Sequence, residues 1–388
     1  MAPVILTLNA GSSSLKFALY KGADETILRG VVEGIGQAPR VSLIASHMRR
    51  LDPPDLAGSS YEAVLDTLLR WLNAQHLEGD VIGAVGHRIV HGGLRFADPV
   101  RINETILAEL DGLVPLAPLH QPHNLAAIRA IAQAQPALPQ VGCFDTAFHR
   151  TMPAVATRLA LPRALGDAEM RRYGFHGLSY EFIAGRLRQI APALARGRVI
   201  VAHLGSGASL CAMRDGRSME TTMGFSTLDG LVMGTRPGCL DAGAVLYLMQ
   251  SRGMAAKAVE DLLYHRSGLL GVSGISGDMR ELATSARPEA REAVELFTYR
   301  IAGEAGRLTA ALGGLDGLVF TAGIGEHDAA LRAEVCRRLA WLGVVPDPIA
   351  NAGGHGRIST DASLIEAWVV PTDEEAVIAR HTHALVAA

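Results

Sequence analysis

Three glycine-rich segments, each following a short apolar run, are the first candidates for chemistry in this sequence. They cover residues 9–14, 203–208 and 323–327. Small residues after a strand let backbone N–H groups close around an anion, although most such turns are only tight connections. Three of them in one chain favour binding of nucleotide phosphates. The patterns GxxxxGK[ST] and GxGxxG are both absent, so neither a Walker-type NTPase nor a dinucleotide-binding dehydrogenase is indicated.

Cationic side chains beside glycines are the second candidates. Arg88 lies in GHRIVHGG and Arg236 in MGTRPG, where small neighbours leave room for a phosphate; a surface arginine in an ion pair is the alternative. Lys16, one of only three lysines, follows the first glycine-rich segment and could face a phosphate, an acidic partner or only solvent. His87 and His91 have the spacing of zinc ligands on a helix, but their glycine and β-branched neighbours favour extended structure.

Carboxylates and one histidine complete the set. Asp145 follows an apolar run, so it could hold Mg²⁺ through water, orient a nucleophile or cap a helix. The acidic segment 372–375 includes Glu374, which would equally suit a helix N-terminus. His176 lies between glycines and aromatic residues, where a packed and hydrogen-bonded ring is the alternative. Anion-binding loops, two arginines and oxygen ligands are together what phosphoryl transfer requires.

Length and composition indicate a globular protein of two domains. The chain has 388 residues, 49% of them hydrophobic and 19% charged, and is too long for one typical core. A net charge of -3 without a basic block argues against nucleic acid as a partner. No apolar run reaches the ~18 residues of a membrane span, the N-terminus lacks a basic signal-peptide segment, and the four cysteines are scattered. We therefore expect a cytoplasmic protein that has no membrane partner.

Strand-like and helix-like segments alternate along the chain, which predicts an α/β fold. Segments 4–8 and 15–20 are joined by a Gly/Ser-rich turn. The same order of strand, small-residue turn and strand occurs again half a chain length later, at 199–202 and 209–213, which suggests an internal duplication. Further strands are expected at 84–90, 140–144, 318–320 and 368–370. Helices are expected at 61–74 after a Ser60 cap, from Pro122 to about 134, from Pro288 to 312 with Gly313 as C-cap, and from 374 onward.

The sequence resembles the acetate kinase family, which includes acetate and propionate kinases, within the superfamily of actin, chaperone ATPase domains and sugar kinases. The similarity covers essentially the whole chain, and the motifs occur in family order. They are NAGSSSLKF at 9–17, GHRIVHGG at 86–93, PLAPLH at 115–120, FDTAFH at 144–149, YGFHG at 173–177, HLGSGASL at 203–210, MGTRPG at 233–238, FTAGIGE at 320–326 and the acidic turn at 372–375.

This resemblance implies an α/β fold of two actin-like (ribonuclease H-like) domains with duplicated topology and a cleft between them. The N-terminal domain would comprise residues 1–150 and the returning C-terminal helix at 373–388. The second domain, residues 151–372, would bind the nucleotide. The resemblance also implies a homodimer.

The resemblance further implies roles for individual residues. Mg²⁺, with Mn²⁺ as an alternative, would lie near Asn9, Asp145 and Glu374. Arg88 and Arg236 would neutralise charge on the transferring phosphoryl group, and Asp145 and His176 would be catalytic with them. The acetate substrate would contact Arg88, Val90, Leu119, His120 and Phe175. ATP or ADP would contact Lys16, His203, Leu204, Gly205, Ser206, Gly207, Asp278, Met279, Arg280, Gly323, Ile324, Gly325, Glu326 and His327.

Four positions depart from the family pattern. Ser206 and His327 stand where the family usually has asparagine, and both lie in the nucleotide-binding segments. Thr227 replaces a proline that borders the acyl pocket, and Ala242 replaces another proline. No charged catalytic group is lost, but the preference for acyl-chain length stays open.

The expected reaction is direct in-line transfer of the γ-phosphoryl group of ATP to acetate, which gives acetyl phosphate and ADP. Acetate is already ionised at neutral pH, so no strong general base is needed. Propionate or another short carboxylate is the alternative acceptor. A sugar kinase would need an activated base and a polar pocket, which the apolar residues Val90, Leu119 and Phe175 disfavour. A non-catalytic actin-like ATPase would not need two arginines at the phosphoryl group.

Overall fold

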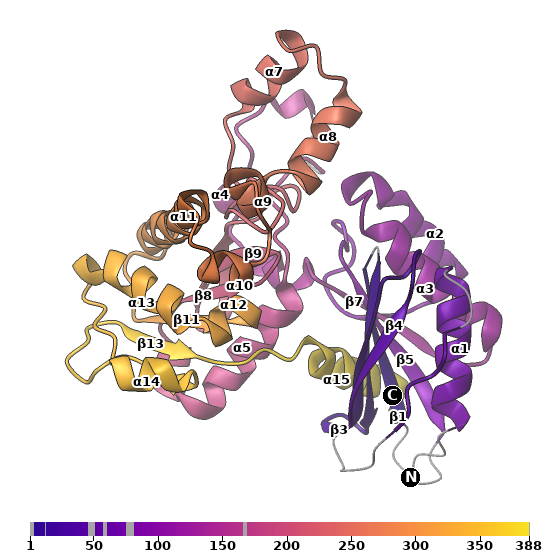
Figure 1. The fold of residues 1–388 in the computed structure, drawn as a ribbon. Coiled ribbons are helices and arrows are strands. Elements are labelled where there is room, and N and C mark those ends of the chain that lie inside the picture. The colour runs from indigo at the N-terminus through magenta and orange to yellow at the C-terminus, as the bar shows by residue number, and fades with distance from the viewer. Residues whose placement is uncertain are drawn as a thin grey trace. The chain divides into compact units, whose positions relative to one another are not determined.

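A computed structural model describes residues 4–11, 13–45, 51–56, 60–74, 81–165 and 169–387. The chain divides into two compact units (Figure 1). Unit 1 comprises Met1–Ala147 with Asp373–Ala388, and unit 2 comprises Phe148–Thr372. Each unit is built on one mixed β-sheet with helices packed against it, so the predicted α/β class is confirmed. Within the described ranges, no helix combines the length and the apolar content that a membrane span requires.

The sheet of unit 1 has the strand order β4-β3-β2-β1-β5-β7-β6. The successive pairs β1–β2, β2–β3 and β3–β4 are antiparallel. β1, β5 and β7 are parallel to one another, and β6 pairs antiparallel with β7. The bounds are β1 Val4–Ala10, β2 Ser14–Lys21, β3 Glu25–Glu33, β4 Arg40–Ala45, β5 Ile82–Ile89, β6 Val100–Arg101 and β7 Gln140–Phe144.

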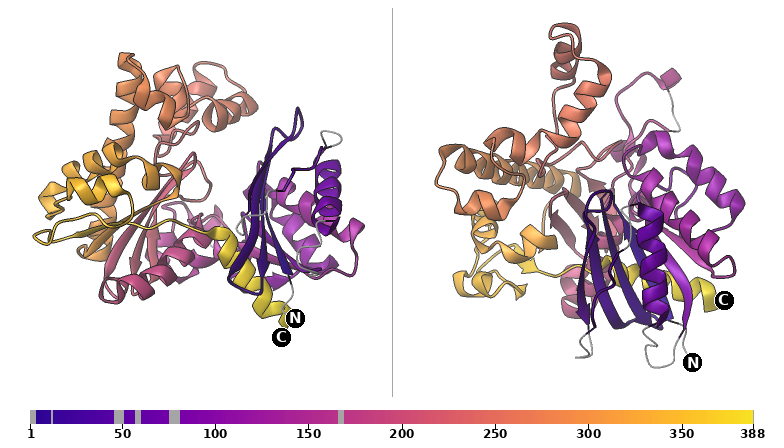
Figure 2. Two further views of the ribbon diagram at one scale, coloured as in Figure 1. Left: turned by 60° about the horizontal axis from the view of Figure 1, so that its bottom comes forward. Right: turned by 45° about the vertical axis from the view of Figure 1, so that its right-hand side comes forward.

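Helices cover both faces of this sheet (Figure 2). Leu6 of β1 and Val85 of β5 pack into the core below α1 (Tyr61–Ala74) and α3 (Gln121–Ala134). The opposite face carries α15 (Glu374–Ala387), which contacts β1, β5 and β7. A Cβ on Gly86 would lie 2.3 Å from Thr382 Oγ1 of α15, so glycine is what allows this close approach. The remaining helix, α2 (Glu104–Gly112), packs against α3.

Unit 2 repeats this topology with the strand order β10-β9-β8-β11-β13-β12. β8, β9 and β10 are antiparallel, β8, β11 and β13 are parallel, and β12 is antiparallel to β13. These six strands therefore match β3-β2-β1-β5-β7-β6 of unit 1 in order and direction, which confirms the predicted duplication. Their bounds are β8 Arg198–Leu204, β9 Ala208–Arg214, β10 Arg217–Thr221, β11 Gly317–Thr321, β12 Gly356–Arg357 and β13 Glu366–Val369.

The longer helices of unit 2 pack on its sheet or extend from it. α5 (Gly177–Ile190) supplies Tyr180, Ile183 and Leu187 to a core with β8 and β9. α11 (Pro288–Leu312) packs against β8, β9 and β10. The others are α4 Ala154–Thr157, α6 Pro192–Ala195, α7 Ala242–Gln250, α8 Ala256–His265, α9 Gly268–Ser273, α10 Met279–Thr284, α12 Ala322–His327, α13 Ala329–Arg338 and α14 Pro348–Gly353.

Most predicted elements are confirmed at their expected positions. α1 begins after Ser60, whose Oγ accepts a hydrogen bond from Ala63 N, and α11 ends at Gly313 with φ 70°. One prediction is wrong: residues 323–327 form α12 and not a loop. Ala322 adopts φ 63°, so the chain turns directly from β11 into a helix whose glycines suggested a loop. Two predicted loops also begin later than expected, because Asn9 lies in β1 and His203 lies in β8.

Candidate active site

Four residues of unit 1 that the sequence selected separately lie together in the structure. Arg88 is near the carboxyl end of β5, and Asp145 directly follows the adjacent parallel strand β7, so both side chains emerge at one edge of the sheet. Arg88 Nε donates to both carboxylate oxygens of Asp145 at 3.0 Å, and its Nη1 donates to Asn9 Oδ1 at 3.0 Å. Glu374, the first residue of α15, has its Oε2 3.9 Å from Arg88 Nε.

The electrostatics of this cluster are those of a buried ion network. The side chain of Asp145 is 1% exposed, that of Glu374 15% and that of Arg88 20%. Burial would lower the pKa of Arg88, but Asp145 and Glu374 raise it above its ordinary value. Burial raises the pKa of Glu374 to about 7, and Asp145 adds to this rise, while Arg88 and Lys16 oppose it.

The donor set at this edge fits a hard divalent cation. Asn9, Asp145 and Glu374 offer amide and carboxylate oxygens, which are the ligands that Mg²⁺ and Mn²⁺ prefer. Burial and the neighbouring Asp145 both disfavour the ionised form of Glu374, so a further cation would stabilise that form. No cluster of three or more His, Cys, Asp or Glu gathers as a metal site among the described residues. A site with few protein ligands suits Mg²⁺, which keeps several waters and also binds substrate phosphates.

Lys16 and the predicted acyl-binding residues are placed as follows. Lys16 is exposed on β2 opposite Asn9 of β1 and lies close enough to Glu374 to lower the pKa of that carboxyl. Val90 is buried directly after β5, where its N–H donates to Asn124 Oδ1 at 3.0 Å. Leu119 and His120 are half-buried in the turn before α3. Phe175 belongs to unit 2 and is also buried.

In unit 2, His176 and His203 form a stacked pair. His176 precedes α5 with φ 58°, a conformation that costs a non-glycine residue of order 1 kcal/mol and is common at functional sites. Its ring lies 4.1 Å from that of His203 at an interplanar angle of 20°. His176 Nδ1 is 2.8 Å from Ser209 Oγ, and His203 Nδ1 is 2.8 Å from Ser179 Oγ. Each imidazole is therefore oriented by a serine hydroxyl.

Arg236 lies close to His176 above Gly207. A Cβ on Gly207 would be 2.8 Å from Arg236 Nη2 and 3.4 Å from His176 Nε2, so a larger residue here would require the Arg236 side chain to move. Arg236 Nη1 donates to the carbonyl of Thr227 at 2.7 Å, and desolvation lowers the pKa of Arg236 to about 10. No carboxylate in the part of the chain that the structure describes forms an ion pair with Arg236. A desolvated guanidinium of this kind would be stabilised by an anionic ligand.

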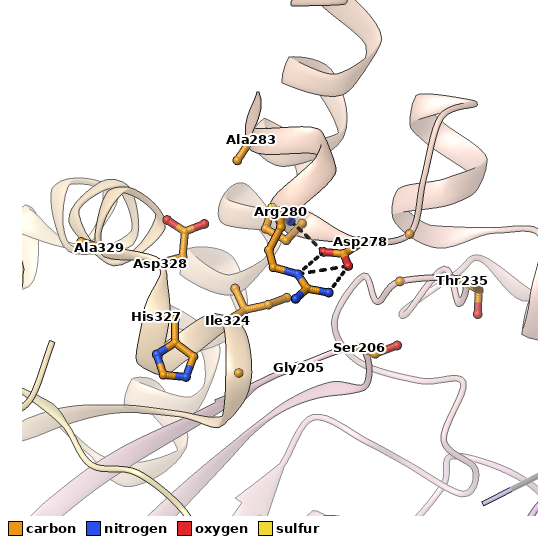
Figure 3. A pocket seen from close by; sticks show the side chains of 14 residues that line it. Gly205, Ser206, Thr235, Asp278, Arg280, Ala283, Ile324, His327, Asp328 and Ala329 are labelled. Carbon is orange, nitrogen blue, oxygen red and sulfur yellow. Dashed lines mark hydrogen bonds and ion pairs between the residues drawn. The ribbon is translucent and has the colours of Figure 1, made fainter. Parts of the chain in front are cut away.

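A cavity of about 710 Å³ opens within unit 2 (Figure 3). Asp278 lies on its wall, caps α10 through Arg280 N and forms an ion pair with the exposed Arg280 side chain at 2.6 Å. Eight of the fourteen lining residues are ones that the family resemblance assigned to the nucleotide. They are Gly205, Ser206, Asp278, Met279, Arg280, Gly323, Ile324 and His327.

The other predicted nucleotide residues do not line this cavity. His203 and Leu204 end β8, and Gly207 lies below Arg236. Gly325 is buried inside α12, and the carboxylate of Glu326 accepts hydrogen bonds from Ala322 N and Thr372 N.

Sequence reasoning missed six residues of the cavity wall, namely Gly234, Thr235, Gly277, Ala283, Asp328 and Ala329. Five of them lie within two residues of predicted site residues, so wider windows around Arg236, Asp278 and His327 would have found them. Ala283 lies one helical turn after Met279 on α10, and its position could have been found from helical spacing. Arg332 was missed as well: its fully buried guanidinium donates to the carbonyls of Gly325 and Glu326.

Comparisons with known proteins identify the family of this chain. The sequence model of the Acetokinase family matches residues 4–380. An acetate kinase from Rhodopseudomonas palustris is 54% identical, with 98% of this chain and 98% of that protein covered. The crystal structure of a propionate kinase from Francisella tularensis matches with a TM-score of 0.90 at 37% identity, covering 98% of this chain and 99% of the other. Acetate kinase from Porphyromonas gingivalis matches with a TM-score of 0.84 at 35% identity, covering 99% and 100%.

The family that the nine ordered motifs predicted is thereby confirmed. The family match spans both units, and the two solved structures align over nearly the full length of this chain, so the duplicated α/β architecture is also that of its relatives. The chain belongs to the acetokinase family.

Proposed function

We propose that this protein is an acetate kinase, which reversibly transfers the γ-phosphoryl group of ATP to acetate and gives acetyl phosphate and ADP. The observation that carries the proposal is the cluster of Asn9, Arg88, Asp145 and Glu374 at one sheet edge, found in a chain of the acetokinase family. This cluster combines an arginine for phosphoryl oxygens with hard oxygen ligands for a divalent cation. Mg²⁺ is the proposed metal, and Mn²⁺ could replace it.

The chemistry requires positioning and charge neutralisation more than proton transfer. An acetate carboxylate is ionised at neutral pH, so it can attack the γ-phosphorus without a strong base. Arg88 and Arg236 would neutralise charge that develops on the phosphoryl oxygens, and His176, oriented by Ser209, would donate a further hydrogen bond there. Asn9, Asp145 and Glu374 would hold the metal, which supplies charge neutralisation to the nucleotide phosphates when it is bound.

The nucleotide would occupy the cavity of unit 2. A volume of about 710 Å³ is in the range of small-molecule and cofactor sites. Gly205 and Ser206 directly follow β8 and line the cavity, and such small residues allow phosphates to approach the backbone. Asp278, Met279 and Arg280 would lie on the nucleoside side, opposite α12. His203, Leu204 and Gly207 would support the phosphate end.

Propionate is the alternative acceptor, and two observations keep it in the proposal. The Francisella tularensis relative, with a TM-score of 0.90, is a propionate kinase. Thr227 stands where the family usually has a proline that borders the acyl pocket, so the acyl-chain preference stays open. Val90, Leu119, His120 and Phe175 would bound the acyl group, and their apolar members suit a short chain. We favour acetate because relatives that are 54% identical over 98% of this chain are acetate kinases.

Three further assignments complete the proposal. The two actin-like domains would comprise residues 1–150 with 373–388 and residues 151–372. The units of the structure divide three residues earlier, after Ala147. The protein would act as a cytoplasmic homodimer whose ligands are small molecules.

A hydroxylamine assay tests the proposed function. The purified protein is incubated with ATP, Mg²⁺ and one acceptor from acetate, propionate, butyrate and glucose, and acyl phosphate is trapped as the hydroxamate. The proposal predicts hydroxamate with acetate above propionate and none with glucose. A higher kcat/KM for propionate would reassign the acceptor. ATP consumption with glucose alone, or without any acceptor, would contradict carboxylate kinase activity.

A further inference from the structure

The carboxylate of Glu326 is directed at the backbone of its own unit, although its neighbours on α12 line the cavity. Glu326 Oε1 accepts hydrogen bonds from Ala322 N at 2.8 Å and from Thr372 N at 3.1 Å. Thr321 Oγ1 lies 3.5 Å from the same oxygen. Gly323, Ile324 and His327 line the cavity, but Glu326 does not. Its side chain therefore connects the start of α12 to the end of unit 2.

The hydrogen bond from Thr372 N to the Glu326 carboxylate continues the row of hydrogen bonds between β11 and β13 beyond the end of the two strands. The two strands are parallel, and directly beyond β13 the N–H of Val370 donates to Phe320 O at 3.0 Å. Thr372 is the next donor on the same side of the strand, two residues on. The chain of β11 has by then turned into α12 at Ala322, whose φ is 63°. The carboxylate of Glu326 thus accepts the hydrogen bond of Thr372 where β11 no longer runs alongside.

Thr372 in turn leads to the stacked histidines. Its Oγ1 lies 2.9 Å from Ser179 Oγ, and Ser179 Oγ lies 2.8 Å from His203 Nδ1. Ser179 is fully buried and His203 is 8% exposed, so the contact between Ser179 and His203 is shielded from water. His203 stacks on His176 at 4.1 Å. A continuous chain of hydrogen bonds therefore runs from Glu326 to the ring that packs on the proposed catalytic histidine.

We propose that Glu326 is a positioning residue for the phosphoryl-transfer site and not a ligand of the nucleotide. It fixes the backbone of Thr372, the Thr372 hydroxyl orients Ser179, and Ser179 sets the ring of His203 against His176. The inference rests on the proposed function, because it takes His176 and His203 as residues of the reacting site. It changes the role that the family resemblance implied for Glu326.

Because of Arg332, a positioning role of Glu326 can be tested separately from a role in nucleotide binding. Arg332 is buried, and its Nη1 donates to Gly325 O at 3.0 Å and Glu326 O at 2.8 Å. Its Nε donates to Asn351 Oδ1 at 2.8 Å, and its Nη2 donates to Asn351 O at 2.6 Å. Arg332 thus holds the C-terminal end of α12 through main-chain carbonyls, independently of the Glu326 carboxylate. Truncation of Glu326 should therefore leave the C-terminal end of α12, with the cavity-lining His327, in place.

The test compares Glu326→Ala, Glu326→Gln and Thr372→Val in the full-length protein. Each variant is measured for kcat by the hydroxamate assay and for ADP binding by isothermal titration calorimetry. Glu326→Ala should lower kcat by roughly 10- to 100-fold, because small misplacements of reacting groups have effects of this size, while the ADP Kd stays unchanged. Glu326→Gln keeps an oxygen that can accept from Thr372 N, so it should restore most of kcat. Thr372→Val keeps the N–H but loses the hydroxyl, so kcat should fall with unchanged ADP binding.

The matched control is Glu334→Ala, which removes a surface acid of unit 2 that pairs with Arg337 and Arg338 and should change neither quantity. A higher ADP Kd with an unchanged kcat in Glu326→Ala would overturn the inference and make Glu326 a nucleotide ligand. Loss of kcat in Glu326→Gln equal to that in Glu326→Ala would also overturn it, because the charge itself would then be required. If Glu326→Ala does not fold, Glu326→Gln and Thr372→Val decide alone. A wild-type protein that forms no acyl phosphate but binds ADP would reject the proposed function instead.

Discussion

Arg88 and Asp145 form a two-oxygen ion pair at the ends of adjacent parallel strands, with Arg88 Nε 3.0 Å from each carboxylate oxygen. The Nη2 atom of the same arginine also donates to Asp145. One buried carboxylate thus orients the proposed phosphoryl-binding arginine and could also supply an oxygen ligand to the proposed cation. Such fork geometry fixes a guanidinium plane in a way that a lysine cannot reproduce.

Removal of this guanidinium should disable phosphoryl transfer. We expect Arg88→Ala to lower kcat by about 10²–10³, the loss typical of one preorganised electrostatic donor. Arg88→Lys should recover little, because an ammonium cannot span both Asp145 oxygens. The hydroxamate assay measures both variants. Arg70→Ala is the control, since Arg70 pairs with Asp66 on the exposed face of α1. Near-normal turnover in Arg88→Ala would remove Arg88 from the scheme.

Gly207 should be intolerant of a side chain for a local steric reason. A Cβ there would lie 2.8 Å from Arg236 Nη2, so Gly207→Ala must displace the arginine or the loop. We expect kcat to fall by roughly tenfold or more, as misplaced charged groups lose transition-state contacts. Gly185→Ala is the matched control, because that glycine of α5 has nothing within 4 Å of an added Cβ. The control should keep kcat and stabilise the fold by about 0.5–1 kcal/mol. Equal activity in both variants would contradict the packing of Arg236 over Gly207.

The cavity of unit 2 can be blocked without touching any ion pair. Ala283 lines it from α10, so Ala283→Trp should fill part of the space and weaken ADP binding. Ligand at 100 times Kd stabilises a fold by about 2.7 kcal/mol, which a thermal-shift titration detects. The variant should lose the ADP-induced rise in Tm, whereas Thr284→Trp, one position along the helix, should keep it. A full ADP shift in Ala283→Trp would place the nucleotide elsewhere.

Buried histidines should make the protein sensitive to mild acid. Burial lowers the pKa of His87 from its ordinary 6.5 to about 4, and His91 and His149 are lowered to about 4 in the same way. The unfolded chain therefore takes up protons between pH 6.5 and 4 that the folded chain does not, so stability is full above pH 6.5 and declines as pH falls. Each such histidine should cost about 1 kcal/mol between pH 7.5 and 5.5. Urea unfolding of His87→Gln should show a shallower pH slope by that amount, and an identical slope would refute the assignment.

Much of the fold could be predicted because local signals and tertiary packing agree. The Pro288 start and the Gly313 end of α11 are set by backbone rules, and both are observed. The resemblance to the acetate kinase family implied that Arg88, Asp145 and Glu374 belong to one site, and their positions at strand ends and a helix start explain how the fold brings them together. The duplication followed from two strand–turn–strand segments at half-chain spacing.

Other features depend on contacts that the sequence does not reveal. The helix α12 is rich in glycine and is stabilised by Glu326 at its start and by Arg332 near its end, so its local sequence suggested a loop. Arg332 resembles a surface residue of α13, and its burial is explained by contacts with the carbonyls of Gly325 and Glu326 and with Asn351, 19 residues away. The helices α7 and α8 were not predicted, and of their residues only Val259 is buried, so the core of unit 2 does little to fix them.

The most direct test of the central claim follows phosphorus from ATP to a carboxylate oxygen. The protein is incubated with ATP, Mg²⁺ and doubly ¹⁸O-labelled acetate, and the products are examined by ³¹P NMR spectroscopy. The account predicts acetyl phosphate whose phosphorus signal shows the isotope shift of a bridging ¹⁸O, because the acetate oxygen attacks the γ-phosphorus. Inorganic phosphate as the sole product, or acetyl phosphate without the labelled bridge, would contradict it.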